Sequence, residues 1–121
     1  MGATIFSQLD ITINNDLAIS SQHYDYSSLI QTLLSLNKGA KHSWLQGGLF
    51  YKDTAGQMDI MGNNNSGFQK RSGQIAQSNV IELMVKIYSV FFYQNKLLPN
   101  NTCLTLDFTR QKDTFCLLAM I

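Results

Sequence analysis

The chain has 121 residues, of which 45% are hydrophobic and only 14% are charged, against an average of about 25% charged residues in globular proteins. This length fits one domain, and the net charge of +1 provides no positive field for nucleic acid or an acidic membrane surface. Aromatic residues make up 11%, which is too many for a disordered chain. Because so few charged residues repel neighbouring copies of the chain in solution, the composition favours a protein that is part of an assembly.

The first segment predicts a β-hairpin. Apolar and polar residues alternate over residues 5–14, which is the period of a half-buried strand. The turn residues Asn14, Asn15 and Asp16 follow, and Asn and Asp tolerate the left-handed backbone that tight hairpins need. Residues 17–19 then predict a short return strand.

Helical spacing begins after the hairpin and predicts an amphipathic helix near residues 26–37. Asp25 or Ser27 can cap its start, and Asn37 or Gly39 can end it. A further helical turn is expected over residues 43–46. The apolar face of the main helix consists of Tyr26, Leu29, Ile30, Leu33 and Leu34.

Residues 38–79 are expected to form a loop or insertion region, irregular over residues 53–79 and most polar over residues 62–67. The last third returns to strand patterns at residues 81–87 and 104–109, which flank an aromatic connection at residues 91–93. Residues 115–118 predict the start of another strand. The fold class expected from this order is mainly β and antiparallel, with one inserted helix.

Histidine and cysteine residues give no pattern typical of a metal site. His23 and His42 lie far apart, without a carboxylate or cysteine at ligand spacing, and are interpreted as surface or capping residues. Cys103 and Cys116 lack the spacing of a zinc or redox motif and are interpreted as small buried hydrophobic residues.

Other candidate motifs for chemistry are equally weak. Asp53 and Asp59 flank Gly56, but the residues between them lack the ligand spacing of a calcium loop. Lys70-Arg71 is interpreted as part of a solvated loop, and the aromatic residues 91–93 as core. No serine lies in a nucleophile elbow, and no glycine-rich loop ends in Lys-Ser or Lys-Thr. We therefore expect no catalytic, cofactor-binding or metal-binding residues, and no enzyme.

Four blocks in the same order resemble a known family. They are IFSQLDITIN at 5–14, YDY at 24–26, LFYKDTAGQMD at 49–59, and LLPNNTCLTLDFTRQKDTFCL at 97–117. Together they are similar to the major capsid proteins of Polinton (Maverick) elements, which are virus-like transposable elements. The blocks are spread over nearly the whole chain.

The resemblance implies a viral jelly roll, an antiparallel β-sandwich. In this family, two such sandwiches stand side by side in each chain and three chains form a capsomer. Because a jelly roll needs eight strands, we expect residues 1–121 to be a partial jelly-roll domain, truncated to the N-terminal half of the family's protein and drifted from it in sequence. The function implied is that of a structural capsid protein, or of its domesticated or degenerate remnant.

The partners implied by the resemblance are other copies of the chain, as a homotrimer, or full-length capsid chains. No specific nucleic acid and no membrane are expected, and no signal peptide or membrane-spanning segment is visible. We therefore expect an intracellular protein, in a virion-like particle if it assembles.

Two other function classes stay open at this point. A jelly-roll binding module could take a glycan or a host protein, with Trp44 and the polar loop at residues 62–67 as its only lectin-like features. A cupin-like metalloenzyme would need a histidine-rich site, and the two scattered histidines argue against it.

Overall fold

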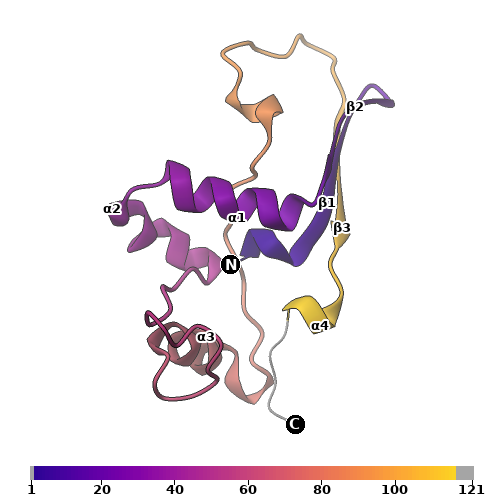
Figure 1. Cartoon of the computed structure of the whole chain (residues 1–121). Coiled ribbons are helices and arrows are strands. Elements are labelled where there is room, and N and C mark those ends of the chain that lie inside the picture. The colour runs from indigo at the N-terminus through magenta and orange to yellow at the C-terminus, as the bar shows by residue number, and fades with distance from the viewer. Residues whose placement is uncertain (1, 117–121) are drawn as a thin grey trace. The chain divides into compact units, whose positions relative to one another are not determined.

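The computed structural model describes residues 2–116, and Figure 1 shows its helices and strands. The strands are β1 (Phe6–Ile13), β2 (Asp16–Gln22) and β3 (Leu104–Arg110). The α-helices are α1 (Tyr24–Ser35), α2 (Lys38–Lys41), α3 (Ser66–Ile75) and α4 (Asp113–Cys116). Short 3₁₀ helices are η1 (Gly2–Ile5), η2 (Trp44–Gly48), η3 (Ala76–Ser78) and η4 (Val90–Tyr93).

The described chain divides into two compact units. Unit 1 comprises Gly2 and Leu36–Val85, and unit 2 comprises Ala3–Ser35 and Lys86–Cys116. Unit 2 contains the three strands with α1 and α4, whereas unit 1 contains α2, α3 and the irregular segments around them. The expectation of a single, incomplete domain stays a prediction.

The predicted hairpin is confirmed. Strands β1 and β2 pair antiparallel, with Leu9 opposite Ser21 and Ile11 opposite Ile19. Both turn residues, Asn14 (φ 49°) and Asn15 (φ 71°), have the left-handed backbone that a tight hairpin turn requires. The asparagines therefore set the hairpin locally.

The predicted strand at 104–109 is also confirmed, as β3. It pairs antiparallel with β1, so the sheet has the order β2-β1-β3, and the three strands run side by side in Figure 1. Asn14 fixes the end of this pairing, because its N–H donates to the Cys103 carbonyl and its Oδ1 accepts the Cys103 N–H, both at 2.9 Å. One residue therefore closes the hairpin and aligns the third strand.

Helix α1 confirms the predicted helix, but its buried side is polar. Asp25, Ser28 and Thr32 are buried, whereas most of the apolar stripe is exposed, with Leu34 82% exposed. The buried hydroxyls are satisfied within the helix, since Ser28 Oγ donates to the Asp25 carbonyl and Thr32 Oγ1 donates to the Ser28 carbonyl. Hydroxyls that donate to carbonyls of their own helix can be buried without a partner outside the helix. This polar side of α1 therefore faces inward, and the apolar stripe faces outward.

The core of unit 2 lies between the sheet and two tyrosines. Leu9 and Ile11 of β1 are fully buried, and Tyr24 and Tyr88 pack on them. The Tyr24 hydroxyl accepts the Tyr88 N–H at 2.9 Å, and its ring lies edge-on to Phe108 of β3, with centroids 6.3 Å apart. Burial raises the pKa of the Tyr24 phenol above its ordinary value.

Several predicted elements differ in the structure. The predicted strand at 81–87 is wrong, because this segment has no strand partner within residues 2–116. Instead, the Met84 N–H donates to the Gly47 carbonyl at 3.0 Å. The Val85 side chain packs on Gly2 and Gly48. The Val85 side chain can approach this closely only because the residue is glycine, since a Cβ at Gly2 would lie 2.3 Å from Val85 Cγ1. The alternating apolar residues are thus used in loop packing.

Helices also replace predicted irregular or extended chain. The region 38–79, expected as a loop or insertion region, contains α2, η2 and α3. The helical turn expected at 43–46 is present as η2, which runs on through Gly47 and Gly48. Residues 115–116 end helix α4 and do not begin a strand, while residues 117–118 lie outside the described part. The antiparallel sheet is confirmed, but helices occupy more of residues 2–116 than strands do.

Replacing Tyr24 by Phe should lower the free energy of unfolding by about 1–3 kcal/mol, because the buried Tyr88 N–H loses its acceptor. Tyr88→Phe is the matched control, since the Tyr88 hydroxyl is buried with no hydrogen-bond partner in the described part of the chain. Denaturant unfolding should show Tyr88→Phe to be no less stable than the wild type. A larger loss for Tyr88→Phe than for Tyr24→Phe would contradict this description of the core.

Candidate functional site

The two histidines lie at the surface, as predicted. His23 has a left-handed backbone (φ 54°) just before α1, and its carbonyl accepts the Ser27 N–H. His42 follows α2 and its backbone N–H donates to the Lys38 carbonyl. Both side chains are exposed, so the interpretation as surface or capping residues is confirmed.

The interpretation of Cys103 as buried is wrong. Its thiol is free and exposed, because the residue lies at the rim of the sheet, where its backbone bonds Asn14 from both its N–H and its carbonyl. The side chain of Cys116 lies outside the described part of the structure. Within residues 2–116, no three His, Cys, Asp or Glu side chains come close enough together to hold a metal ion.

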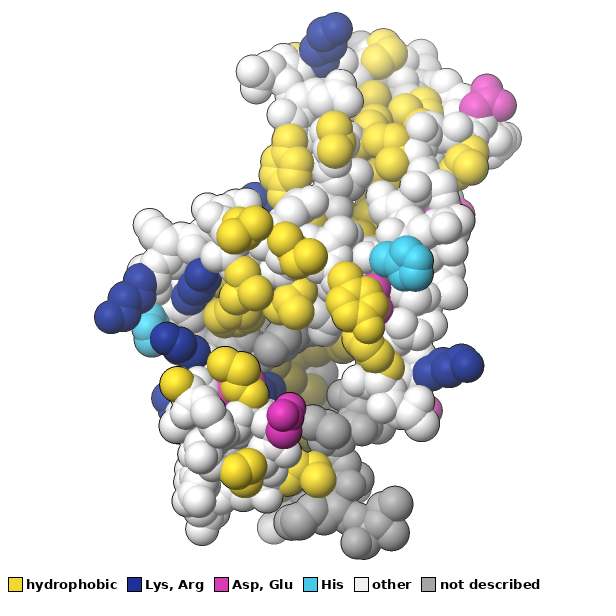
Figure 2. Space-filling model, in the orientation of Figure 1, with side chains coloured by type: hydrophobic (Ala, Val, Ile, Leu, Met, Phe, Trp, Pro, Cys, Tyr) yellow, Lys and Arg dark blue, Asp and Glu magenta, His cyan; other side chains and the backbone are white. Residues whose placement is uncertain are grey.

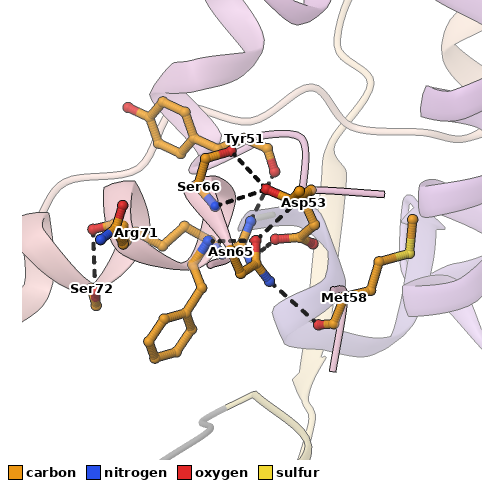
Figure 3. A network of polar contacts seen from close by, with 10 residues as sticks. Tyr51, Asp53, Met58, Asn65, Ser66, Arg71 and Ser72 are labelled. Carbon is orange, nitrogen blue, oxygen red and sulfur yellow. Dashed lines mark hydrogen bonds and ion pairs between the residues drawn. The ribbon is translucent and has the colours of Figure 1, made fainter. Parts of the chain in front are cut away.

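The segment around Asp53 forms a polar network in unit 1, and Figure 3 shows it from close by. Its centre is Asn65, which is only 1% exposed and caps the start of α3 by accepting the Phe68 N–H at 3.3 Å. The same Oδ1 accepts the Thr54 N–H at 3.4 Å, and Nδ2 donates to the Met58 carbonyl at 3.5 Å. One buried amide thus joins α3 to both ends of the 54–58 turn.

Arg71 makes the second connection of this network. Its Nη1 donates to the Tyr51 carbonyl at 2.8 Å and its Nη2 pairs with Asp53 Oδ1 at 2.6 Å. The prediction that Lys70-Arg71 lies in a solvated loop is wrong, because both residues belong to helix α3 and Arg71 is half-buried there. The sequence did not reveal this pair, because 18 residues separate the two charges.

A close approach of backbones completes the network. At Gly67 an added Cβ would lie 2.5 Å from Asp53 Oδ1 and 2.9 Å from the Lys52 carbonyl oxygen. Only glycine permits this distance, so residues 52–53 lie directly against the first turn of α3. We call the set Tyr51, Asp53, Thr54, Asn65, Gly67 and Arg71 the α3 clamp.

The α3 clamp is suited to positioning a loop. The Asp53 carboxylate is paired with Arg71, and the Asn65 side-chain amide is hydrogen-bonded through both its oxygen and its nitrogen. The turn that the clamp holds carries the exposed side chains of Met58, 64% exposed, and Ile60. Asp59, the other half of the calcium alternative, is exposed and lies outside the clamp. The geometry therefore presents apolar side chains on a fixed loop.

The features considered for glycan binding lie in the same unit. Trp44 is exposed in η2. The polar loop at 62–67 is partly folded, because Asn65 is buried as the cap of α3 and residues 66–67 belong to that helix. A freely exposed polar loop is therefore not what these residues form.

Exposed apolar side chains form the second candidate feature, in unit 2. The predicted core aromatics at 91–93 divide: Phe91 packs against the core, whereas Phe92 and Tyr93 are exposed. A groove of about 280 Å³ lies beside Phe91 and Phe92, and its lining is completed by Gln94, Lys96, Leu97, Leu98 and Leu104. The exposed stripe of α1 belongs to the same unit, and Figure 2 shows hydrophobic side chains at the surface of the face in view.

No family model, curated protein or solved structure matches this chain. Across residues 2–116 there is no helix of the length and hydrophobicity needed to cross a membrane.

Gly67→Ala should lower the free energy of unfolding by about 1–3 kcal/mol, since the new methyl group would force Asp53 and the Lys52 carbonyl away from α3. Gly73→Ala on the same helix meets nothing within 4 Å and should instead stabilise by about 0.5–1 kcal/mol, through helix propensity. Thermal or denaturant unfolding of the two variants checks the clamp. Equal effects would show that residues 52–53 do not lie against α3.

Asn65→Ala should cost about 1–2 kcal/mol, because it removes the helix cap and leaves the Thr54 N–H without its acceptor. Asn64→Ala, one residue earlier and exposed, should change the free energy of unfolding by less than about 0.5 kcal/mol. Limited proteolysis should also cut the 54–62 turn faster in Asn65→Ala alone. Unchanged cleavage there would exclude a role of Asn65 in holding the turn.

Proposed function

We propose that this chain is a structural, capsid-like protein, or the domesticated or degenerate remnant of one, that associates with copies of itself. The observation that carries the proposal is the distribution of apolar residues. The buried hydrophobic residues in the described part are few, namely Leu9, Ile11, Tyr24, Leu45 and Tyr88, and the exposed large hydrophobic residues outnumber them several-fold. Apolar side chains exposed in this number are typical of proteins that bury them in an interface.

The low charge supports the same proposal. Helix α1 has one charged residue, Asp25, which is buried, so its outer face has no charge to repel another copy. The connection at residues 90–98 has Lys96 as its only charged residue among exposed apolar ones. Interfaces that form permanently are depleted in charge in this way.

The resemblance to Polinton major capsid proteins supports the assignment to a capsid-like class. Two of its blocks, residues 5–14 and 97–117, provide the strands β1 and β3 that pair in the sheet. A third block, residues 49–59, provides the segment and turn that the α3 clamp holds. We propose that the three-stranded sheet is part of an antiparallel sandwich, a partial jelly roll, and that the clamped turn contributes loop contacts.

Sedimentation velocity over a wide concentration range tests the proposal. The wild type should gain mass with concentration, and it should also bind full-length capsid protein of this family. The variant Leu34→Glu/Leu97→Glu changes two side chains that are 82% and 97% exposed, so the core is untouched and association should weaken at least about tenfold.

The matched control is Ser35→Glu/Asn100→Glu, which adds the same charge at exposed polar positions. It should associate like the wild type, which separates loss of apolar contact from general charge repulsion. A wild type that stays monomeric at high concentration and does not bind full-length capsid protein would contradict the proposed function.

A further inference from the structure

Strand β3 is an open edge of the sheet. Within residues 2–116 its only strand neighbour is β1, because the sheet order is β2-β1-β3. The strand pairs without interruption from Leu104 to Thr109, and the register shift of this pair lies beyond it, between Phe6 and Gln8 of β1. A long and regular open edge can accept another strand through its backbone groups.

The direction of the backbone groups follows from the hydrogen bonds at both ends of β3. The Cys103 carbonyl accepts from Asn14 N–H and the Thr109 carbonyl accepts from Ser7 Oγ, so both point toward β1. Backbone groups alternate in direction along a strand. The N–H and C=O groups of Leu104, Leu106 and Phe108 therefore point away from β1, to the open side.

We propose that two copies of this chain pair through β3, antiparallel and centred on Leu106, to form a continuous six-stranded sheet. In this register Leu106 lies opposite the second copy's Leu106, and Leu104 lies opposite the second copy's Phe108. The outward backbone groups of these residues then face each other, as in the hydrogen-bonded pairs of an antiparallel ladder.

The side chains fit this register on both faces of the sheet. Leu104, Leu106 and Phe108 are only partly covered within one chain and continue the apolar face across the junction. On the other face, Thr105 lies opposite the second copy's Asp107. Because the pair is symmetric, a hydroxyl lies opposite a carboxylate at two positions. Centring the pair on Asp107 instead would place the two like charges directly opposite each other, which is unfavourable.

The other edge of the sheet is less suited to pairing. Strand β2 contains a register irregularity, because Ile11 lies opposite Ile19 but Thr12 lies opposite Leu17, which leaves Ala18 without a partner. Such a bulge twists an edge away from a flat ladder. The second copy is therefore assigned to β3, and this assignment deepens the proposed self-association, on which it rests.

Charge at position 105 tests the pairing. Thr105→Asp would place a carboxylate opposite the second copy's Asp107 at two symmetric positions, and the dissociation constant of the dimer should rise about tenfold. Thr105→Lys would place an ammonium group there, and the dissociation constant should fall several-fold. Thr109→Asp, on the same strand and exposed, lies opposite the second copy's Cys103 and should leave the dimer unchanged.

Sedimentation equilibrium on the full chain gives these constants, and circular dichroism verifies that each variant is folded. Opposite shifts for Thr105→Asp and Thr105→Lys, with no shift for Thr109→Asp, support the β3 pairing. Association that none of these variants alters would overturn the pairing while leaving the proposed function intact. A wild type that does not associate at all would overturn both.

Discussion

The hydroxyl of Tyr24 and the backbone N–H of Tyr88 form the hydrogen bond on which unit 2 depends. The bond joins the first residue of α1 to a segment 64 residues later in the chain. The same tyrosine ring contacts Phe108, so helix, connection and sheet meet at one side chain that is 2% exposed. Asp25, the next residue, accepts Gln111 Nε2 at 3.0 Å and ties the helix to the end of β3 as well. Once these two residues are fixed, the buried side of α1 is decided.

The exposed apolar surface is a consequence of that constraint. With Tyr24 and Asp25 turned inward, the residues that follow on the same side of the helix are Ser28 and Thr32, and the leucine and isoleucine stripe faces outward. The fully buried core of unit 2 is small, because it consists of Leu9, Ile11 and two tyrosines, and the other hydrophobic residues packed against it are only partly buried. The fold is therefore organised around polar contacts, and its apolar side chains are available for association. Unit 1 follows the same rule, since a buried asparagine and an arginine–aspartate pair hold its loop.

Local signals in the sequence predicted the local structure well. Asn14 and Asn15 predicted the hairpin correctly, because asparagine itself tolerates the left-handed backbone of the turn. The alternating residues at 104–109 predicted a strand correctly, and this strand pairs with β1. Long-range contacts decided the rest. The alternation at 81–87 is as regular, but Val85 packs on two glycines and the segment forms no ladder. Helical spacing located α1 but could not show which side is buried, because that depends on Tyr88 and Gln111, far away in the chain. The clamp around α3 was missed for the same reason.

Hydrogen–deuterium exchange measured by mass spectrometry, at low and at high protein concentration, tests most directly whether the chain covers its open surface with another copy of itself. Peptides covering residues 104–108 should exchange more slowly at high concentration, because the outward N–H groups of Leu104, Leu106 and Phe108 become hydrogen-bonded to the second copy. Peptides covering the hairpin turn at Asn14 and Asn15 should exchange equally fast at both concentrations. Exchange of residues 104–108 that does not depend on concentration would contradict the account.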